Sequence, residues 1–504
     1  MKSSHMVDSE ELTQKPAAIV VLDGQSLPVG DVVRLAHGAA RPVPGTEAMK
    51  RVEESWHAAR ELAASGRVYG RSTGVGANRS ETVPTGAAAD HGLRLLRSHA
   101  GAVGNPLPAR EVRAMLAVRA NQLLAGGAGL RPTVVTALCE ALESGAYPVV
   151  NEYGSVGTGD IAALSQLGLA LAGEHPWEGG TPPRAQALDN NDALAMISSN
   201  ALTLGQSALA LDELRRLVAA TQVVGALSLL AVDGSYEAYA EPVHAARPHP
   251  GSYAVATTMR RLLGAPERPT PPLGRIQDPY GFRCLPQIHG PAQDAADLLE
   301  RTLAAEINAA AENPLIRADT ALNSSPAAYH HGGFYMAQLA LALDHFRLAI
   351  AQTARLSTSG LSALNEPGFT RLPPFLADGE AASSGVMILE YAAGAALGDL
   401  RAFSAPASLG HAVLSRGVEE QASFASLGAR QTLRACDAYR HVVGCELVAA
   451  VRALRQRDLR IDPGLPVGLA FDLADAALEP DVVDRPLTDD VRVAAALLDQ
   501  FADL

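Results

Sequence analysis

The sequence predicts a mainly α-helical protein, and three observations support this fold class. Alanine and leucine dominate the 504 residues, and both are strong helix formers. Apolar residues recur with helical spacing through most of the chain, and several periodic segments exceed 25 residues. The long segments carry alanine-rich faces, which allow helices to approach closely, as in a bundle. A loop-rich N-terminal region is expected to precede this bundle.

The elements follow from these patterns in chain order. Short apolar runs interrupted by Gly and Pro over residues 18–45 predict loops and brief strands. Helical periodicity runs from residue 44 to 63. Residues 66–90, rich in Gly, Ser and Thr, predict a loop whose length is uncommon unless the loop has a function. A Pro-rich interval interrupts the pattern at 175–190. Further helices are expected at about 91–100, 108–125, 131–145, 160–174, 191–232, 235–245, 250–264, 288–312, 331–358, 383–402, 416–455, 468–478 and 487–502.

The domain organisation is predicted in four parts. Residues 1–17 contain Ser3-Ser-His-Met6, which resembles a cloning remnant, and are expected to be disordered. The other parts are an N-terminal domain at 18–235, a central bundle of long helices at 236–455 and C-terminal helices at 456–504. Alanine on two opposite faces of the long helices also predicts burial between subunits, because one subunit cannot cover both faces of a central helix.

Composition excludes several classes of protein. The formal net charge is −13 and no basic stripe is present, so nucleic acid is an unexpected partner. No run approaches about 18 uninterrupted apolar residues, so no membrane span is expected. The N-terminus lacks a signal-peptide pattern. The four cysteines are scattered without zinc-type spacing, which fits the reducing cytoplasm.

A glycine-rich turn is the most informative segment. Gly154-Ser-Val-Gly-Thr-Gly159 stands directly before Asp160 and an apolar helical run. One interpretation is a flexible loop capped by Asp160 at the start of the helix. The alternative is a tight turn at a helix N-terminus, where free amide N–H groups bind an anion or polarise an electrophile.

Further motifs accompany this turn. Tyr69-Gly-Arg-Ser-Thr-Gly-Val-Gly76 is a glycine loop that contains a tyrosine, and Leu96–Gly104 includes His99. Gln277-Asp-Pro-Tyr-Gly-Phe-Arg-Cys-Leu-Pro-Gln287 is a long block with an arginine suited to bidentate carboxylate binding. Each residue alone has a structural explanation, such as an anchoring tyrosine, a capping histidine or an Arg–Asp pair.

Together these segments, in this order, resemble the histidine and aromatic amino acid ammonia-lyase family over most of residues 45–455. The resemblance implies an elongated helical bundle of the histidine ammonia-lyase/fumarase-like type. It also implies a homotetramer with active sites shared between subunits, and no external cofactor. The family's electrophile is methylidene-imidazolone (MIO), a ring built from its own Ala-Ser-Gly tripeptide.

The present turn is one residue shorter than the family pattern Gly-Ser-Val-Gly-Ala-Ser-Gly-Asp. One alignment deletes the serine, leaves Thr158-Gly159 and gives no MIO. The other uses Gly157-Thr158-Gly159, in which loss of water from the threonine gives an ethylidene, a hindered version of MIO. Both alternatives are open at the level of sequence.

The resemblance also implies roles for single residues. Tyr69 corresponds to the catalytic base, although a phenol with a pKa near 10 needs nearby positive charge to act as one. Arg283 corresponds to the carboxylate-binding arginine. The other correspondences place Tyr280 and Phe334 beside the electrophile, Gln277 in the same wall, His99 and Glu419 at a polar ring, and Ser198 at an asparagine that Asn200 is able to replace. The adjacent His330 and His331 are expected to point apart, so no metal site is predicted.

These roles predict an ammonia-lyase that converts an aromatic L-amino acid, histidine first and tyrosine second, to an α,β-unsaturated acid. A relative of the family that lacks MIO, either repurposed or catalytically silent, is the main alternative. An aminomutase uses the same residues. An unrelated helical scaffold is disfavoured by the Gln277–Gln287 block.

Overall fold

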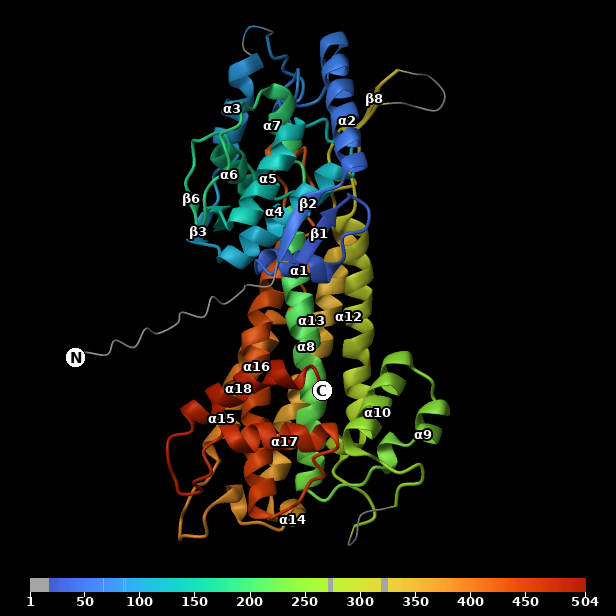
Figure 1. Cartoon of the computed structure of the whole chain (residues 1–504), viewed down its shortest axis with the longest axis vertical. Coiled ribbons are helices and arrows are strands. Elements are labelled where there is room, and N and C mark those ends of the chain that lie inside the picture. The colour runs from blue at the N-terminus through green and yellow to red at the C-terminus, as the bar shows by residue number, and fades with distance from the viewer. Residues whose placement is uncertain (1–17, 67, 85, 87, 271–274, 319–324) are drawn as a thin grey trace, which may run out of the picture.

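The computed structural model describes residues 18–504 except 67, 85, 87, 271–274 and 319–324. The body is elongated (Figure 1): long helices run along the longest axis, and the shorter helices and small sheets of the N-terminal part gather at one end. The predicted mainly α-helical class with a loop-rich N-terminal region is confirmed. The residues 1–17 expected to be disordered lie outside the described residues.

Helices carry most of the chain. The principal ones are α1 (Val29–Ala36), α2 (Thr46–Ser65), α3 (Ala88–His99), α4 (Ala109–Leu124), α5 (Pro132–Ser144), α6 (Ile161–Leu171), α7 (Asn190–Ile197), α8 (Ala201–Ala231), α9 (Glu241–Ala245), α10 (Pro250–Leu263), α12 (Leu285–Ile307), α13 (Ala337–Leu364), α15 (Ile388–Phe403), α16 (Ala425–Gln456), α17 (Pro466–Ala477) and α18 (Thr488–Phe501). Short helical turns are α11 (Tyr280–Arg283), α14 (Pro367–Thr370), η1 (Gly76–Asn78), η3 (Glu237–Tyr239), η4 (Pro374–Leu376), η5 (Ala407–Leu409) and η6 (Ser415–Gly417).

In the part of the chain that the structure describes, four two-stranded sheets complete the fold. The strands β1 (Ala18–Leu22) and β2 (Ala40–Pro44) pair in parallel, with Ala18 opposite Ala40, and they confirm the predicted brief strands. The helix α1 between them was not predicted, although its Val32 and Leu35 are fully buried. The antiparallel pairs join β3 (Val103–Pro106) to β5 (Asn151–Tyr153), β4 (Tyr147–Pro148) to β6 (Trp177–Glu178) and β7 (Leu315–Arg317) to β8 (Ala327–Tyr329).

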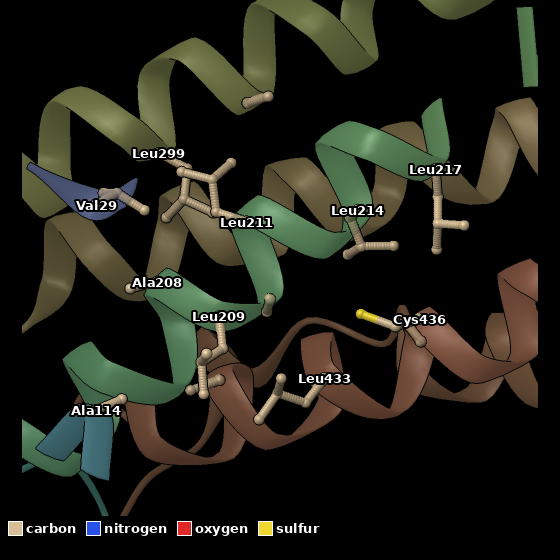
Figure 2. Close-up of a cluster of buried hydrophobic side chains, with 14 of the residues drawn as sticks. Val29, Ala114, Ala208, Leu209, Leu211, Leu214, Leu217, Leu299, Leu433 and Cys436 are labelled. Carbon is tan, nitrogen blue, oxygen red and sulfur yellow. The ribbon is translucent and has the colours of Figure 1, made fainter. Parts of the chain in front are cut away.

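The core is built around α8. This helix packs against α16, α4, α12 and α13, and its leucines lie between their facing sides, as Figure 2 shows for Leu209, Leu211 and Leu214 beside Leu299 and Leu433. The stretch Asn190–Ala231 is long and apolar enough, by length and composition, to cross a membrane. Because 78% of its most apolar window is buried inside the protein, core packing explains that apolarity.

The structure differs from the predicted helices at functionally informative places. The expected helix 191–232 is interrupted at residues 198–200, which separate α7 from α8. The expected helix 416–455 begins only at Ala425, because residues 410–424 turn back toward the N-terminal end. The expected helix 288–312 ends at Ile307. In the first two cases the chain leaves the helix where it supplies the wall of a cavity. The proposed domain boundaries remain a prediction, since α8 extends from the N-terminal end through the bundle.

Candidate active site

A cavity of about 330 Å³ lies where these interrupted helices meet. Residues from five separate segments line it. They come from the Tyr69 loop, the glycine-rich turn, α7 and its end, the 313–334 segment and the 410–424 segment. The lining residues are Tyr69, Gly76, Arg79, Thr158, Gly159, Ile161, Leu194, Ile197, Ser198, Ser199, Asn313, His330, Phe334, Val418 and Glu419.

Buried contacts fix the Tyr69 loop. Arg71, 2% exposed, donates hydrogen bonds to the carbonyls of Ala128, Gly129 and Asn191. Gly70 has φ +67°, and a Cβ there would lie 2.2 Å from a methyl of Leu194, so glycine is required. Tyr69 is thereby directed into the cavity, where its Oη accepts a hydrogen bond of 2.8 Å from the backbone N–H of Gly76.

The glycine-rich turn precedes α6 and is held from both sides. Its Gly157 has φ +87°, and a Cβ there would lie 2.2 Å from the Oγ of Ser423. That Oγ donates to the Gly157 carbonyl at 3.0 Å, and the N–H of Phe424 donates to the Val156 carbonyl at 2.9 Å. Thr158 and Gly159 therefore form part of the cavity surface rather than a flexible loop.

Asp160 anchors the same turn to the start of α8. It is the N-cap residue of α6, but its side chain makes no cap hydrogen bond there. Its buried carboxylate instead accepts from the N–H and the hydroxyl of Thr203, at 2.8 and 2.9 Å. Burial raises the pKa of this carboxyl. The capping interpretation is thus corrected: Asp160 caps the first turn of α8, where free N–H groups stabilise a carboxylate.

The interruption between α7 and α8 places three polar residues beside the turn. The carbonyl of Ser199 accepts from the N–H of Asp160 at 2.7 Å, and the Oγ of Ser198 accepts from the N–H of Asn313 at 3.0 Å. Asn200 is fully buried, and its Nδ2 donates to the carbonyl of Phe334 at 2.9 Å. Its Oδ1 has no partner among the described residues, which leaves one buried acceptor at the floor of the site.

Electrostatics oppose ionisation of the tyrosine. Burial is the largest effect and raises the pKa of Tyr69, and the Glu419 carboxylate raises it further. The Gly76 N–H and the Arg79 guanidinium act in the opposite direction. A substrate cation or ring N–H between Tyr69 and Glu419 would relieve the repulsion between two developing negative charges.

The two histidines of the opposite wall point apart, as predicted. His330 lies in the cavity wall with its ring edge-on to Tyr69, at 6.3 Å between centroids. The ring of His331 instead bonds the Glu312 carbonyl and the Gly333 N–H, at 2.8 and 2.9 Å. His331 therefore shapes the segment, while His330 faces the substrate space.

The Gln277–Gln287 block lies at the other end of the bundle. Arg275 donates to the carbonyls of Val232 and Asp233, just after the last residue of α8. Since α8 has 31 residues and begins beside the cavity, its length of about 46 Å separates this block from the cavity within one chain. Arg283 stacks on Tyr280, which is 70% exposed, and bonds the Asp278 carbonyl at 2.9 Å. Within one subunit, therefore, the turn does not face Arg283.

A sequence model described as aromatic amino acid lyase matches residues 27–469 of this chain. The chain belongs to the aromatic amino acid lyase family. The recognition made from the motifs is confirmed, and this family member is a carbon–nitrogen lyase.

Relatives and solved structures agree with this placement. Histidine ammonia-lyase of Geobacillus thermodenitrificans is 32% identical over 501 residues, covering 96% of this chain and 98% of the relative. The crystal structure of histidine ammonia-lyase from Trypanosoma cruzi superposes with a TM-score of 0.87 at 26% identity, covering 96% and 93% of the two chains. An ergothioneine-degrading ergothionase from Treponema denticola gives the same TM-score and identity, covering 96% and 99%.

The lyase cavity combines expected and unexpected residues. Six of the residues singled out from sequence line the cavity: Tyr69, Thr158, Gly159, Ser198, Phe334 and Glu419. Two more, Gly157 and Asn200, contact the lining from behind. The remaining four lie outside the lining: His99, Gln277, Tyr280 and Arg283. His99 ends α3 with its Nδ1 at the carbonyl of Leu95. Sequence reasoning missed Arg79 as a site residue. Its position three residues after the Tyr69 motif was the available signal.

Proposed function

We propose that this lyase eliminates ammonia from histidine, with tyrosine as second substrate, to give the α,β-unsaturated acid. The observation that carries the proposal is the convergence of Tyr69, Glu419 and the Thr158–Gly159 turn on one cavity in a chain whose relatives include histidine ammonia-lyases. The Glu419 carboxylate is a suitable acceptor for an imidazole N–H. Tyr69 would take the β-proton, so that the C–H electron pair forms the double bond and the amine leaves.

The carboxylate of the substrate requires a second copy of the chain. Arg283 has the planar fork for a bidentate carboxylate pair, but it lies at the far end of α8. The exposed apolar side chains of Leu341 and Leu348 on α13 and Tyr391 on α15 support assembly, at 61%, 47% and 67% exposure. We therefore propose a cytoplasmic homotetramer in which the partner subunit's Arg283, together with Gln277 and Tyr280 of the same copy, completes each site. His99 would join once the copies close the cavity.

The family builds an MIO group from its own chain, and the residues of this turn fit it in one register. Gly157-Thr158-Gly159 offers a hydroxyl residue between two glycines, whose φ of +87° and +111° give the tight turn that ring closure requires. The Oδ1 of Asn200, without a partner among the described residues, belongs to the residue that follows Ser199, whose carbonyl accepts from the Asp160 N–H at the end of the turn. When formed, the group would supply an electron-poor carbon for the substrate's amine. Tyr69, Glu419 and the partner subunit's Arg283 would orient the substrate over it.

One experiment tests both the group and the reaction. The intact mass of the purified chain is expected to fall short of its residue sum by two water molecules, and Thr158→Ala should restore the full mass. Incubation with histidine, tyrosine and phenylalanine should then release ammonia and the unsaturated acid, with histidine fastest. Appearance of a β-amino acid would instead identify an aminomutase. An unshortened mass together with no turnover of any of these would exclude the proposal.

A second candidate follows from the shortened turn. If the chain keeps its full mass, elimination needs a substrate whose amine already leaves readily. Ergothioneine, which the structurally similar ergothionase degrades, is a histidine-derived betaine with a quaternary amine of this kind. Release of trimethylamine from ergothioneine by a full-mass chain would favour this function. Complete inertness would favour a silent relative that only binds such ligands.

The shared site has its own test. Tyr69→Phe and Arg283→Gln should each be inactive as separate preparations, because each removes a group from every site. Mixed assemblies refolded or co-expressed from the two variants should regain part of the activity, since some sites then combine an intact Tyr69 with an intact partner subunit's Arg283. No recovery in verified mixed assemblies would contradict sharing.

A further inference from the structure

Tyr69 stands in surroundings that favour its neutral phenol. Burial and the Glu419 carboxylate both hold its pKa above the ordinary value, whereas the N–H of Gly76 and the Arg79 guanidinium work against them. A base for a carbon-bound proton must present the phenolate in a useful fraction near neutral pH. The cavity therefore needs a fixed positive charge close to the phenol oxygen.

Arg79 is placed to provide that charge. The η1 turn (Gly76–Asn78) ends at Arg79, whose N–H donates to the Gly76 carbonyl at 3.1 Å. The Arg79 Nη1 reaches the same carbonyl at 3.5 Å. The N–H of Gly76 is in turn the donor to the Tyr69 Oη at 2.8 Å. The Tyr69 oxygen thus bonds the N–H of Gly76, and the Arg79 guanidinium lies at the carbonyl of the same glycine, within one short turn.

The remaining contacts keep this turn in place. The hydroxyl of Ser415, in η6, accepts a hydrogen bond of 2.9 Å from the N–H of Ala77. The other titratable groups at Tyr69 are Glu419 and the edge-on ring of His330. No carboxylate forms an ion pair with Arg79 among the residues that the structure describes, so its charge is not neutralised by a fixed partner there.

We propose that Arg79 is a positioning residue of this lyase, supplying a positive charge near Tyr69 that makes the phenolate, which takes the β-proton, easier to form. The inference rests on the proposed role of Tyr69 as base and holds for either leaving amine. It distinguishes Arg79 from Arg283: the first acts on the base within its own subunit, and the second on the carboxylate.

The test compares Arg79→Gln with Arg79→Lys. The glutamine variant removes the charge and should lower kcat at neutral pH by about three- to tenfold, the effect of one nearby, partly solvated charge. The limb of the pH–rate profile that rises with ionisation of Tyr69 should move to higher pH. In Arg79→Lys, kcat at neutral pH and the position of this limb should both stay close to wild type. Arg492→Gln, at an exposed arginine on α18, is the matched control and should change neither.

A direct titration makes the test independent of turnover. A fluorinated tyrosine at position 69, whose phenol is more acidic, should titrate at higher pH in Arg79→Gln than in the otherwise unchanged chain. An unchanged titration overturns the inference, even if activity falls. A rise in KM alone, with titration and kcat preserved, also overturns it and makes Arg79 a substrate-binding residue. If the chain turns over none of the offered substrates, the titration still decides the role of Arg79, so the two proposals fail separately.

Discussion

A buried ion pair connects the wall of the cavity to the core, and breaking it should be costly. Arg119 of α4 donates to Glu312 at 2.8 Å, and the two side chains are 0% and 2% exposed. Arg119 also donates to the Ala195 carbonyl. Glu312→Gln keeps the shape but leaves a buried cation without its counter-charge. Removal of one partner from a buried pair costs about 3–5 kcal/mol.

A double-mutant cycle measures this coupling. Unfolding by urea should be followed at one protein concentration for Glu312→Gln, Arg119→Met and the double variant. Each single change should cost about 3–5 kcal/mol, and the double should cost clearly less than their sum, because it buries no lone charge. Asp489→Asn is the control, since its pair with Arg492 is 85% and 73% exposed and should contribute below about 1 kcal/mol. Additive losses, or a loss for Glu312→Gln no larger than the control, would refute the reasoning.

Three further outcomes follow from the contacts described above. Burial raises the pKa of Glu446 to about 7, so the folded state favours the protonated carboxyl. The contribution of this group to the free energy of unfolding is therefore fully present below about pH 4 and is lost as the pH rises through 7. Glu446→Gln should therefore raise the urea concentration at the midpoint of unfolding, relative to wild type, at pH 8 but not at pH 4. Gly157→Ala should abolish turnover and lower the melting temperature, because its Cβ would meet the Ser423 Oγ at 2.2 Å; an active, stable variant would show that the turn adapts. Tyr69→Phe should lower kcat by at least about a hundredfold with the circular dichroism spectrum unchanged, and retained activity would remove Tyr69 as base.

The local sequence pattern was sufficient to predict where most helices of the bundle begin and end. Helical spacing and alanine-rich faces located α4, α5, α10 and α18 to within a few residues, because each buries a continuous apolar face. The same signal failed at residues 198–200 and 416–424. There the residues are mostly polar but contain no proline that would end a helix, and the backbone leaves the helix to make contacts with residues far away in the chain, such as Phe424 with Val156. Such long-range contacts leave no periodic trace.

Only part of the candidate site could be predicted from the sequence. Tyr69, Thr158, Phe334 and Glu419 stand in motifs that the resemblance brings together, and the structure gathers them in one cavity. Arg283 stands in the most specific motif, yet within one chain it lies at the opposite end of α8 from the cavity, and a motif does not record where its residues lie in the fold. Arg79 lies three residues beyond the Tyr69 motif, and the folded turn shows how it is related to Tyr69.

The unbroken course of α8 restricts how this architecture can vary. The helix starts at the candidate active-site cavity and ends near the segment that carries Arg283. Inserting a single residue within it would rotate one end against the other by about 100° and lengthen it by about 1.5 Å. The cavity and the Gln277–Gln287 segment would then lose their present relative orientation. Insertions and deletions are therefore expected in the surface loops, whereas the number of residues between the two ends of α8 should stay constant.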